Sequence, residues 1–254
     1  MPMALLAADE PPPFTAHNLA GASPCLLLCE HASNRLPRRL GDLGLPPAEL
    51  RRHIAWDIGA LSLAEALSRR LDAALFATGY SRLVIDCNRP LSVPSSIPER
   101  SEDTVIPGNL GLDPAARAMR EATLFHPFQA AVAGHIEARR PGCIIGVHSF
   151  TPVYRGVARP WQAGVLFGAA EGFGRALLGA LAAPGLCLGE NEPYRIEIEE
   201  DYTVPVHGDA RGLPALLIEV RQDLLADAAG IAHWAGRLEP AIRQAIAACD
   251  GPAG

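Results

Sequence analysis

Short runs of apolar residues recur along this chain, and several of them end abruptly in polar residues. The first run covers 26–29 and is followed at once by Glu30, His31 and Asn34. Runs of this kind are typical of strands in a parallel sheet, because helices cover such a sheet on both faces. We predict the strands at 25–29, 74–77, 82–86, 142–147, 163–167 and 215–220.

Segments with apolar residues at helical spacing separate these runs. We predict helices at 53–71, 114–139, 171–182 and 231–248, with Pro127 as the point where the second can break. Strands that alternate with helices imply right-handed crossovers and helices on both faces of the sheet. The predicted fold class is therefore α/β, a three-layer α/β/α sandwich with a mainly parallel mixed sheet.

The length of the chain favours one domain over residues 1–254, because α/β domains of this size form a single core. Residues 1–23 contain Pro11-Pro12-Pro13 and no clear period, so we expect an extended lead-in. The stretches 90–111 and 187–211 also lack a regular pattern. Long irregular stretches inside a domain are often functional, and we expect these two to shape a site.

Composition excludes several classes of protein. A formal charge of −6 argues against a nucleic-acid-binding protein, which would carry a basic face. No apolar run reaches about 18 residues, so no membrane span is expected. The six cysteines are scattered, and the N-terminus has no basic residue of the kind that opens a signal peptide. We therefore expect free cysteines, a reducing cytoplasmic location, and a monomer or small homo-oligomer.

Polar side chains with catalytic chemistry stand at or near the ends of four predicted strands. In chain order they are His31, the segment Asp86-Cys87-Asn88-Arg89, His148 and Glu219. Ligands of open α/β sheets collect beyond the carboxyl ends of the strands, so we expect these groups to converge. Two imidazoles and a carboxylate can hold a catalytic zinc ion, and a further carboxylate can take a proton from its water. An Arg beside an Asn suits capture of a substrate carboxylate.

Each of these groups also has a purely structural explanation. Asn88-Arg89-Pro90 can be an ordinary turn, and His148-Ser149 can cap a helix. Glu219 can be the buried partner of Arg82 or Arg221. The joint arrangement favours a site, because four polar clusters at the ends of apolar runs are hard to explain as unrelated turns.

Several segments of the sequence resemble those of known hydrolases. The order of His31, the 86–89 segment, His148-Ser149-Phe150 and Glu219-Val220-Arg221-Gln222-Asp223 resembles the zinc carboxypeptidase superfamily. From about residue 25 to residue 225, the chain more closely resembles the N-formylglutamate amidohydrolase family. The segments that carry this resemblance are Cys29-Glu30-His31-Ala32-Ser33-Asn34, Ile54-Ala55-Trp56-Asp57, Ser81-Arg82-Leu83-Val84, Asn88-Arg89-Pro90, Ile97-Pro98-Glu99-Arg100-Ser101, His148-Ser149-Phe150-Thr151-Pro152-Val153-Tyr154 and Asn191-Glu192-Pro193-Tyr194.

The resemblance implies a zinc-peptidase-like fold and a metal-dependent amidohydrolase. Its small-molecule substrate would be N-formyl-L-glutamate, cleaved to formate and L-glutamate, a reaction of histidine degradation. Carried over to this chain, His31 and His148 are ligands of one zinc ion, and Glu219 is the general base.

The resemblance also assigns contacts to the substrate. Asn88 and Arg89 would hold the substrate's carboxylate. Arg159 and His207 lie in family-like stretches and are candidates for substrate or oxyanion contacts, and Arg82 is a further candidate for the oxyanion.

The third metal ligand is the place where the chain departs from the peptidases. They carry Glu at the position of Asn34, and zinc prefers His, Cys or carboxylate to a neutral amide. Asp57 is the ligand we predict, although an Asp near the start of a helix can also be a cap. Glu30 is a weaker alternative, because adjacent strand residues point to opposite faces.

Two other functions remain open from the sequence. The chain can be an amidohydrolase or carboxypeptidase for another N-acyl amino acid or short peptide, since the irregular loops decide the pocket. It can also be a non-catalytic protein that binds an acidic metabolite. The two histidines and Glu219 favour an enzyme.

Overall fold

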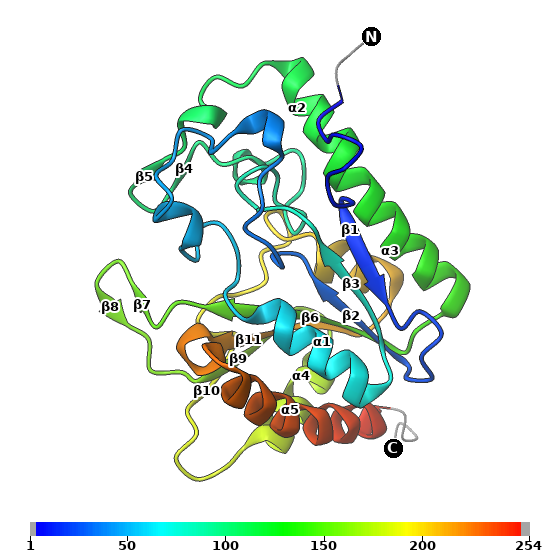
Figure 1. Ribbon diagram of the computed structural model, residues 1–254. Helices are drawn as coiled ribbons and strands as arrows, with labels where there is room; N and C mark the ends of the chain where they lie inside the picture. The colour runs from blue at the N-terminus through cyan, green and yellow to red at the C-terminus, as the bar shows by residue number, and fades with distance from the viewer. Residues whose placement is uncertain (1–3, 250–254) are drawn as a thin grey trace.

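A seven-stranded mixed sheet forms the middle layer of this computed structural model, which describes residues 4–249 (Figure 1). The strand order is β1-β3-β2-β6-β11-β9-β10. The strands are β1 (Phe14–His17), β2 (Cys25–Cys29), β3 (Ala74–Thr78), β6 (Cys143–Phe150), β9 (Ala163–Phe167), β10 (Leu188–Glu190) and β11 (Ala215–Arg221). The four strands β3, β2, β6 and β11 run parallel to one another. The predicted α/β class with a mainly parallel sheet is confirmed.

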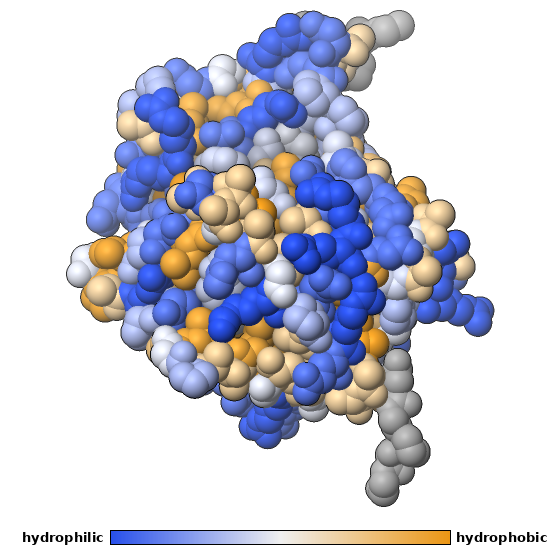
Figure 2. Space-filling view, turned by 60° about the horizontal axis from the view of Figure 1, so that its bottom comes forward, coloured by the Kyte–Doolittle hydropathy of each residue, from blue (hydrophilic) through white to orange (hydrophobic). Residues whose placement is uncertain are grey.

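Helices cover both faces of the sheet, which completes the three layers. Helices α1 (Ala60–Leu71), α4 (Glu171–Leu181) and α5 (Ala228–Cys249) lie on the lower face in Figure 1. Helices α2 (Pro114–Arg120) and α3 (His126–Arg139) lie above it. Figure 2 turns this lower side forward, and the outward surface there is mostly hydrophilic with scattered apolar residues. This is the pattern of helices whose apolar side faces the sheet.

Two buried apolar clusters lie on the two faces of the sheet. Successive residues of a strand point to opposite faces, so Leu27 and Cys29 belong to the cluster between the sheet and helices α1, α4 and α5. Leu26 and Leu28 belong to the other cluster, with Phe128 of α3. All five residues of β2 are buried, as expected for a strand covered on both faces.

The predicted strand at 82–86 is wrong. This segment forms a turn, in which the Val84 amide donates to the Ser81 carbonyl at 2.9 Å. Its apolar residues Leu83 and Ile85 are nevertheless buried in the cluster that contains α3. An apolar run shows that a segment is buried, and it does not distinguish a strand from a buried loop.

Two helices differ in detail from the prediction. The helix predicted over 53–71 begins only at Ala60, after Gly59 with a left-handed φ of 83°. A Cβ at this glycine would lie 2.5 Å from the Leu225 Cβ. The helix predicted over 114–139 is interrupted by a π-helical stretch at Glu121–Phe125, directly before Pro127 in α3. Proline lacks an N–H group and disturbs the preceding turn, which accounts for the break.

The stretches expected to be irregular carry only short elements. Residues 90–111 contain the hairpin β4 (Arg100–Ser101) and β5 (Thr104–Val105), and residues 187–211 contain β10 and a π-helical stretch at Thr203–Gly208. A second hairpin, β7 (Val153–Tyr154) and β8 (Val157–Ala158), follows β6. Within the expected lead-in, β1 pairs antiparallel with β3.

Two expectations from composition can be compared with the structure. Cys25, Cys29, Cys87, Cys143 and Cys187 are free, as predicted for them. Within residues 4–249, no helix has the length and apolar character that a bilayer crossing requires. The single-domain organisation over 1–254 stays a prediction.

Candidate active site

A pocket of about 570 Å³ opens at the carboxyl edge of the parallel strands. His31 directly follows β2, while His148 of β6 and Glu219 of β11 are register partners on neighbouring strands. Asp57, Arg82, Asn88 and Arg89 join them in the lining of the pocket. The structure therefore brings together seven of the site residues predicted from the sequence.

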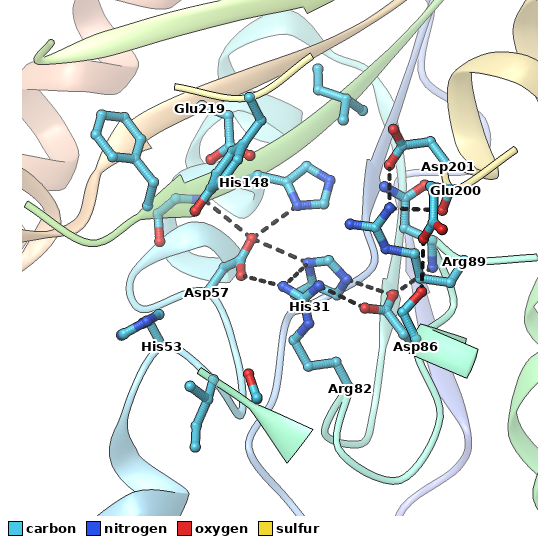
Figure 3. A pocket seen from close by; sticks show the side chains of 18 of the residues that line it. His31, His53, Asp57, Arg82, Asp86, Arg89, His148, Glu200, Asp201 and Glu219 are labelled. Carbon is cyan, nitrogen blue, oxygen red and sulfur yellow. Dashed lines mark hydrogen bonds and ion pairs between the residues drawn. The ribbon is translucent and has the colours of Figure 1, made fainter. Parts of the chain in front are cut away.

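The candidate metal centre is the buried cluster of His31, Asp57 and His148 (Figure 3). Asp57 Oδ2 lies 3.3 Å from His31 Nδ1 and 2.9 Å from His148 Nδ1. A ligand atom from each of the three residues lies within 4.8 Å of the other two. Among the described residues this is the one group of His, Cys, Asp and Glu side chains with that spacing.

Asp57 reaches the cluster because its backbone is tied to two strand ends. Its amide donates to the His31 carbonyl at 2.9 Å, which holds the segment before α1 against the end of β2. On the β6 side, the Ser149 hydroxyl donates to the Ile58 carbonyl at 2.8 Å. Asp57 itself lies three residues before α1, and its carboxylate faces the cluster instead of capping that helix.

Each imidazole of the cluster contacts a second carboxylate through its other nitrogen. His31 Nε2 lies 2.7 Å from Asp86 Oδ1, and His148 Nε2 lies 3.1 Å from Glu30 Oε2. Glu30 is itself fully buried and accepts a hydrogen bond from the Thr203 hydroxyl. Outer carboxylates of this kind fix the tautomer and the orientation of metal-binding histidines. Glu30 thus lies on the far side of His148, where strand alternation places it.

The donor set fits a zinc ion. Two nitrogens and one carboxylate oxygen are common zinc ligands, and bond lengths of about 2.0–2.1 Å in a tetrahedral site give separations near those seen here. Both Nδ1 atoms face the shared Asp57 oxygen, while both Nε2 atoms contact outer carboxylates. Arg82 Nη1 lies 3.2 Å from His31 Nδ1 and must turn aside for that nitrogen to bind metal.

The carboxylates set the charge of the two imidazoles. Burial disfavours charge on His148, but its hydrogen bond to Asp57 and the Glu30 carboxylate 3.1 Å from its Nε2 hold its pKa well above the usual range. Burial and Arg82 also oppose charge on His31, yet Asp86 and Asp57 outweigh them and raise its pKa. Metal binding must therefore displace protons from both rings.

Glu219 is a buried carboxylate of the pocket, next to the candidate metal cluster. Burial raises its pKa to about 7, against the opposing influence of His148. Its Oε2 atom is buried and has no hydrogen-bond partner within the described chain. A carboxyl group in this state can exchange a proton near neutral pH.

Arg89 and Asn88 line the pocket, and one side-chain atom of each contacts the 200–203 segment. Arg89 Nη1 donates to the Glu200 carbonyl at 2.7 Å and lies 3.2 Å from the Asp201 carboxylate (Figure 3). Asn88 Oδ1 accepts the Thr203 amide at 2.9 Å. Both residues thereby connect the 86–89 turn to the 200–203 segment.

Three other candidate residues do not line the pocket. His207 is buried, and its Nε2 lies 2.7 Å from Gln129 Oε1. Asn34 donates to the Leu50 carbonyl at 2.9 Å, which is a structural contact. Arg159 lies behind the pocket, where its guanidinium donates to the Tyr194 hydroxyl at 2.8 Å.

Sequence reasoning missed Tyr194 and Thr203 as parts of the site. Tyr194 lines the pocket, and Thr203 binds Glu30. Both lie in the irregular 187–211 stretch, where no periodic pattern indicates which side chain faces inward. Only Tyr194 lies in a segment that resembles the family, and Thr203 lies outside all of these segments.

Comparisons with known proteins show the family to which the chain belongs. Residues 23–226 match the family model described as N-formylglutamate amidohydrolase. The crystal structure of gene product Atu2144 from Agrobacterium tumefaciens is similar, with a TM-score of 0.93 and 36% identity over 97% of this chain and 100% of that one. The N-formylglutamate amidohydrolase of Ralstonia eutropha JMP134 shares the fold, with a TM-score of 0.68 and 20% identity over 93% and 98% of the two chains. No curated protein matches the chain. Because the family model spans most of its length, the chain belongs to the N-formylglutamate amidohydrolase family.

Proposed function

We propose that this chain is a zinc-dependent hydrolase of the amide bond in a small N-acyl amino acid, with N-formyl-L-glutamate as its substrate. The observation that carries the proposal is the buried His31, Asp57 and His148 cluster with Glu219 beside it in one pocket. Membership of the family supports the formyl substrate. A pocket of about 570 Å³ also suits a small molecule.

The metal site of the proposed enzyme consists of His31, Asp57 and His148. A bound zinc ion would supply Lewis-acid chemistry, which lowers the pKa of a water molecule and polarises the amide carbonyl. Asp86 and Glu30 hold the two imidazoles with their Nδ1 atoms toward Asp57.

Glu219 is the proton carrier of the proposed reaction. Its carboxylate lies close to His148 (Figure 3), its Oε2 has no partner in the described chain, and its pKa of about 7 suits both uptake and release of a proton. It takes a proton from the attacking water and returns it to the nitrogen of the leaving amino acid. Water thus adds to the carbonyl carbon, the C–N bond breaks, and formate and L-glutamate are released.

Arg82 is the residue we propose to stabilise the negative charge that develops on the carbonyl oxygen. Its guanidinium lies between Asp86, at 2.7 Å, and Asp57, at 3.6 Å, and remains partly exposed to the pocket. A cation beside the reacting bond stabilises the charged transition state more than the neutral ground state, and Arg82 can stay close to the metal site through Asp86 after it leaves His31 Nδ1.

The test combines metal content with formate release. The purified protein is stripped with a chelator, reloaded with zinc, and assayed for formate from N-formyl-L-glutamate. We expect one zinc per chain, no formate from the stripped protein, and recovery after zinc is added. Zinc binding without formate release would overturn the substrate, and N-acetyl-L-glutamate and short peptides would then be assayed. Absence of both would overturn the hydrolase.

A further inference from the structure

The Tyr194 hydroxyl is a hydrogen-bond donor without an acceptor in the described chain. Tyr194 lines the pocket, and its oxygen accepts a hydrogen bond from Arg159 Nη1 at 2.8 Å. A guanidinium can only donate, so the phenol keeps its own hydrogen for another partner. Tyr194 as a whole residue is 40% exposed and lines the pocket, so a ligand in the pocket can reach its side chain.

Arg159 is a nearly buried cation whose charge no carboxylate balances. It is 9% exposed, and its guanidinium packs over the rings of Tyr154 and Tyr194, at 4.6 and 4.7 Å from their centroids. Within residues 4–249 it has no carboxylate at ion-pair distance. Its hydrogen bond polarises the phenol, because bonds that involve a charged donor are stronger than neutral ones.

The backbone is built to bring Tyr194 to this place. Residues after β10 turn back over the sheet, and the Glu192 carbonyl lies where side chains of Gly164 and Gly189 would otherwise stand. A Cβ would lie 1.9 Å from the Glu192 oxygen at Gly164 and 2.5 Å from it at Gly189. Only glycine at both positions leaves room for the returning chain, which then carries Tyr194 into the pocket.

The other cations of the pocket are less suited to bind an anion. Arg89 pairs with Asp201, and Arg82 pairs with Asp86 and Asp57. Arg100 is exposed and donates to the Asp103 carbonyl. Arg195 also lines the pocket with an exposed side chain, so it is the alternative that the experiment must separate.

We propose that Tyr194 binds a carboxylate of the substrate through its hydroxyl, with Arg159 behind it as the positioning residue. This inference rests on the proposed function insofar as an N-acyl amino acid supplies the carboxylate. Tyr194 touches the substrate, and Arg159 acts through Tyr194 by fixing the direction of the hydroxyl hydrogen. The Asn88-Arg89 pair then connects loops of the pocket instead of holding the carboxylate.

Binding of glutarate tests this inference without any hydrolysis, because glutarate has two carboxylates and no amide bond. Isothermal titration calorimetry with the zinc-loaded protein measures its affinity. Tyr194→Phe should weaken binding about tenfold, as expected for loss of one hydrogen bond to a charged group. Tyr154→Phe is the matched control, since Tyr154 also lines the pocket and its ring packs on Arg159, but within the described chain its hydroxyl receives no hydrogen bond from Arg159. It should leave the affinity unchanged.

Arg159 is tested by its dependence on Tyr194. Arg159→Met should also weaken glutarate binding about tenfold, and Arg159→Lys should recover part of the loss, because lysine keeps the charge and a donor. The double variant with Tyr194→Phe should bind no more weakly than Tyr194→Phe alone. A purely structural role of Arg159 would instead add its loss to that of Tyr194.

Three outcomes would overturn the inference. The first is failure of the wild-type protein to bind glutarate. The second is an unchanged affinity for glutarate in Tyr194→Phe. The third is a loss of affinity in Arg89→Met or Arg195→Met but not in Tyr194→Phe. Formate release judges the proposed function separately. Glutarate binding through Tyr194 without formate release would keep this inference and overturn the deformylation. Formate release with an unchanged KM in Tyr194→Phe would overturn this inference alone.

Discussion

The pocket has a floor and a wall, and the two are held in place by different means. The floor consists of His31, His148 and Glu219 at the carboxyl ends of neighbouring strands, with Asp57 held beside them by its backbone bond to His31. The wall consists of the segments 82–102 and 194–203. Sheet register fixes the floor, because ladder hydrogen bonds place Glu219 opposite His148. The wall contains only the short ladder of β4 with β5, and backbone bonds of turns together with single buried polar side chains hold the rest of it.

Four such side chains show how the wall is held. Gln129 donates to the Cys87 carbonyl at 2.6 Å, and Asn109 donates to the carbonyls of Leu83 and Pro98 at 2.9 and 2.7 Å. Arg120 and His207 lie behind these contacts. Substitutions in the floor should therefore lower the rate of catalysis, whereas substitutions in the wall should lower stability and weaken substrate binding.

The largest expected effect comes from Glu219→Gln in the floor. The amide cannot take up a proton at neutral pH, so kcat should fall by roughly 10²- to 10⁴-fold while zinc content stays the same. Steady-state formate release and metal analysis measure both. Glu197→Gln, an exposed carboxylate of the same pocket, should keep kcat. Full activity of Glu219→Gln would remove the proton carrier from our mechanism.

The next effect concerns His207 behind the wall and depends on pH. Burial lowers its pKa from 6.5 to about 4, so the folded state resists protonation there. The contribution of neutral His207 to stability is complete above pH 6.5 and is lost as the pH falls toward 4. The loss approaches about 3 kcal/mol across that window.

Urea unfolding at several pH values measures this contribution. The difference in unfolding free energy between the wild type and His207→Gln should shrink by that amount as the pH falls from 6.5 to 4. The exposed His17→Gln is the control and should give no such trend. A constant difference for His207→Gln would contradict the prediction.

Arg120 should give an intermediate effect on stability alone. It is 2% exposed and donates to the Val84 carbonyl, to Asn109 Oδ1 and to the Gly108 carbonyl. Arg120→Met would leave these buried acceptors unpaired, and we expect a loss of about 2 kcal/mol in urea unfolding. Arg117→Met removes a partly exposed pair with Glu121 and should cost about 1 kcal/mol or less. Equal losses would show that burial of the guanidinium does not matter.

The smallest expected effect tests the outer contacts of the floor. Glu30→Gln should weaken zinc binding about tenfold, because the carboxylate orients His148. Competition with a chromophoric chelator measures the affinity. Glu102→Gln is a matched control, since Glu102 also contacts a histidine, His53, which lies outside the candidate metal cluster. Equal weakening in both variants would argue against a specific role for Glu30.

The division between floor and wall also determines which parts of the site could be predicted from the sequence. Apolar runs followed by His31 and His148 indicated both the parallel strands and the edge where these side chains meet. The third ligand needed tertiary information, because Asp57 reaches the cluster through the backbone bond of its segment to His31. The helical period continued through Gly59, so the late start of α1 was not visible in the sequence.

Most of the wall could not be predicted. The run 82–86 is as apolar as a strand, yet its backbone bonds are local turns. Tyr194 reaches the pocket only because the chain folds back over two glycines, and nothing in its own segment reports on those distant positions. Arg159 was recognised by family likeness alone, which did not reveal that Tyr194 stands between it and the pocket.

The direction of β9 has a consequence for how this fold can diversify. Because β9 runs antiparallel to β11, the chain that leaves β6 at Phe150 re-enters the sheet at Ala163 on the same edge. The whole connection, with its hairpin and Arg159, begins and ends at the edge of the sheet where the pocket lies, so it joins two strands without passing over a face of the sheet. A change in the length of this loop would therefore alter the surroundings of the pocket while the strands and helices of both apolar clusters keep their places.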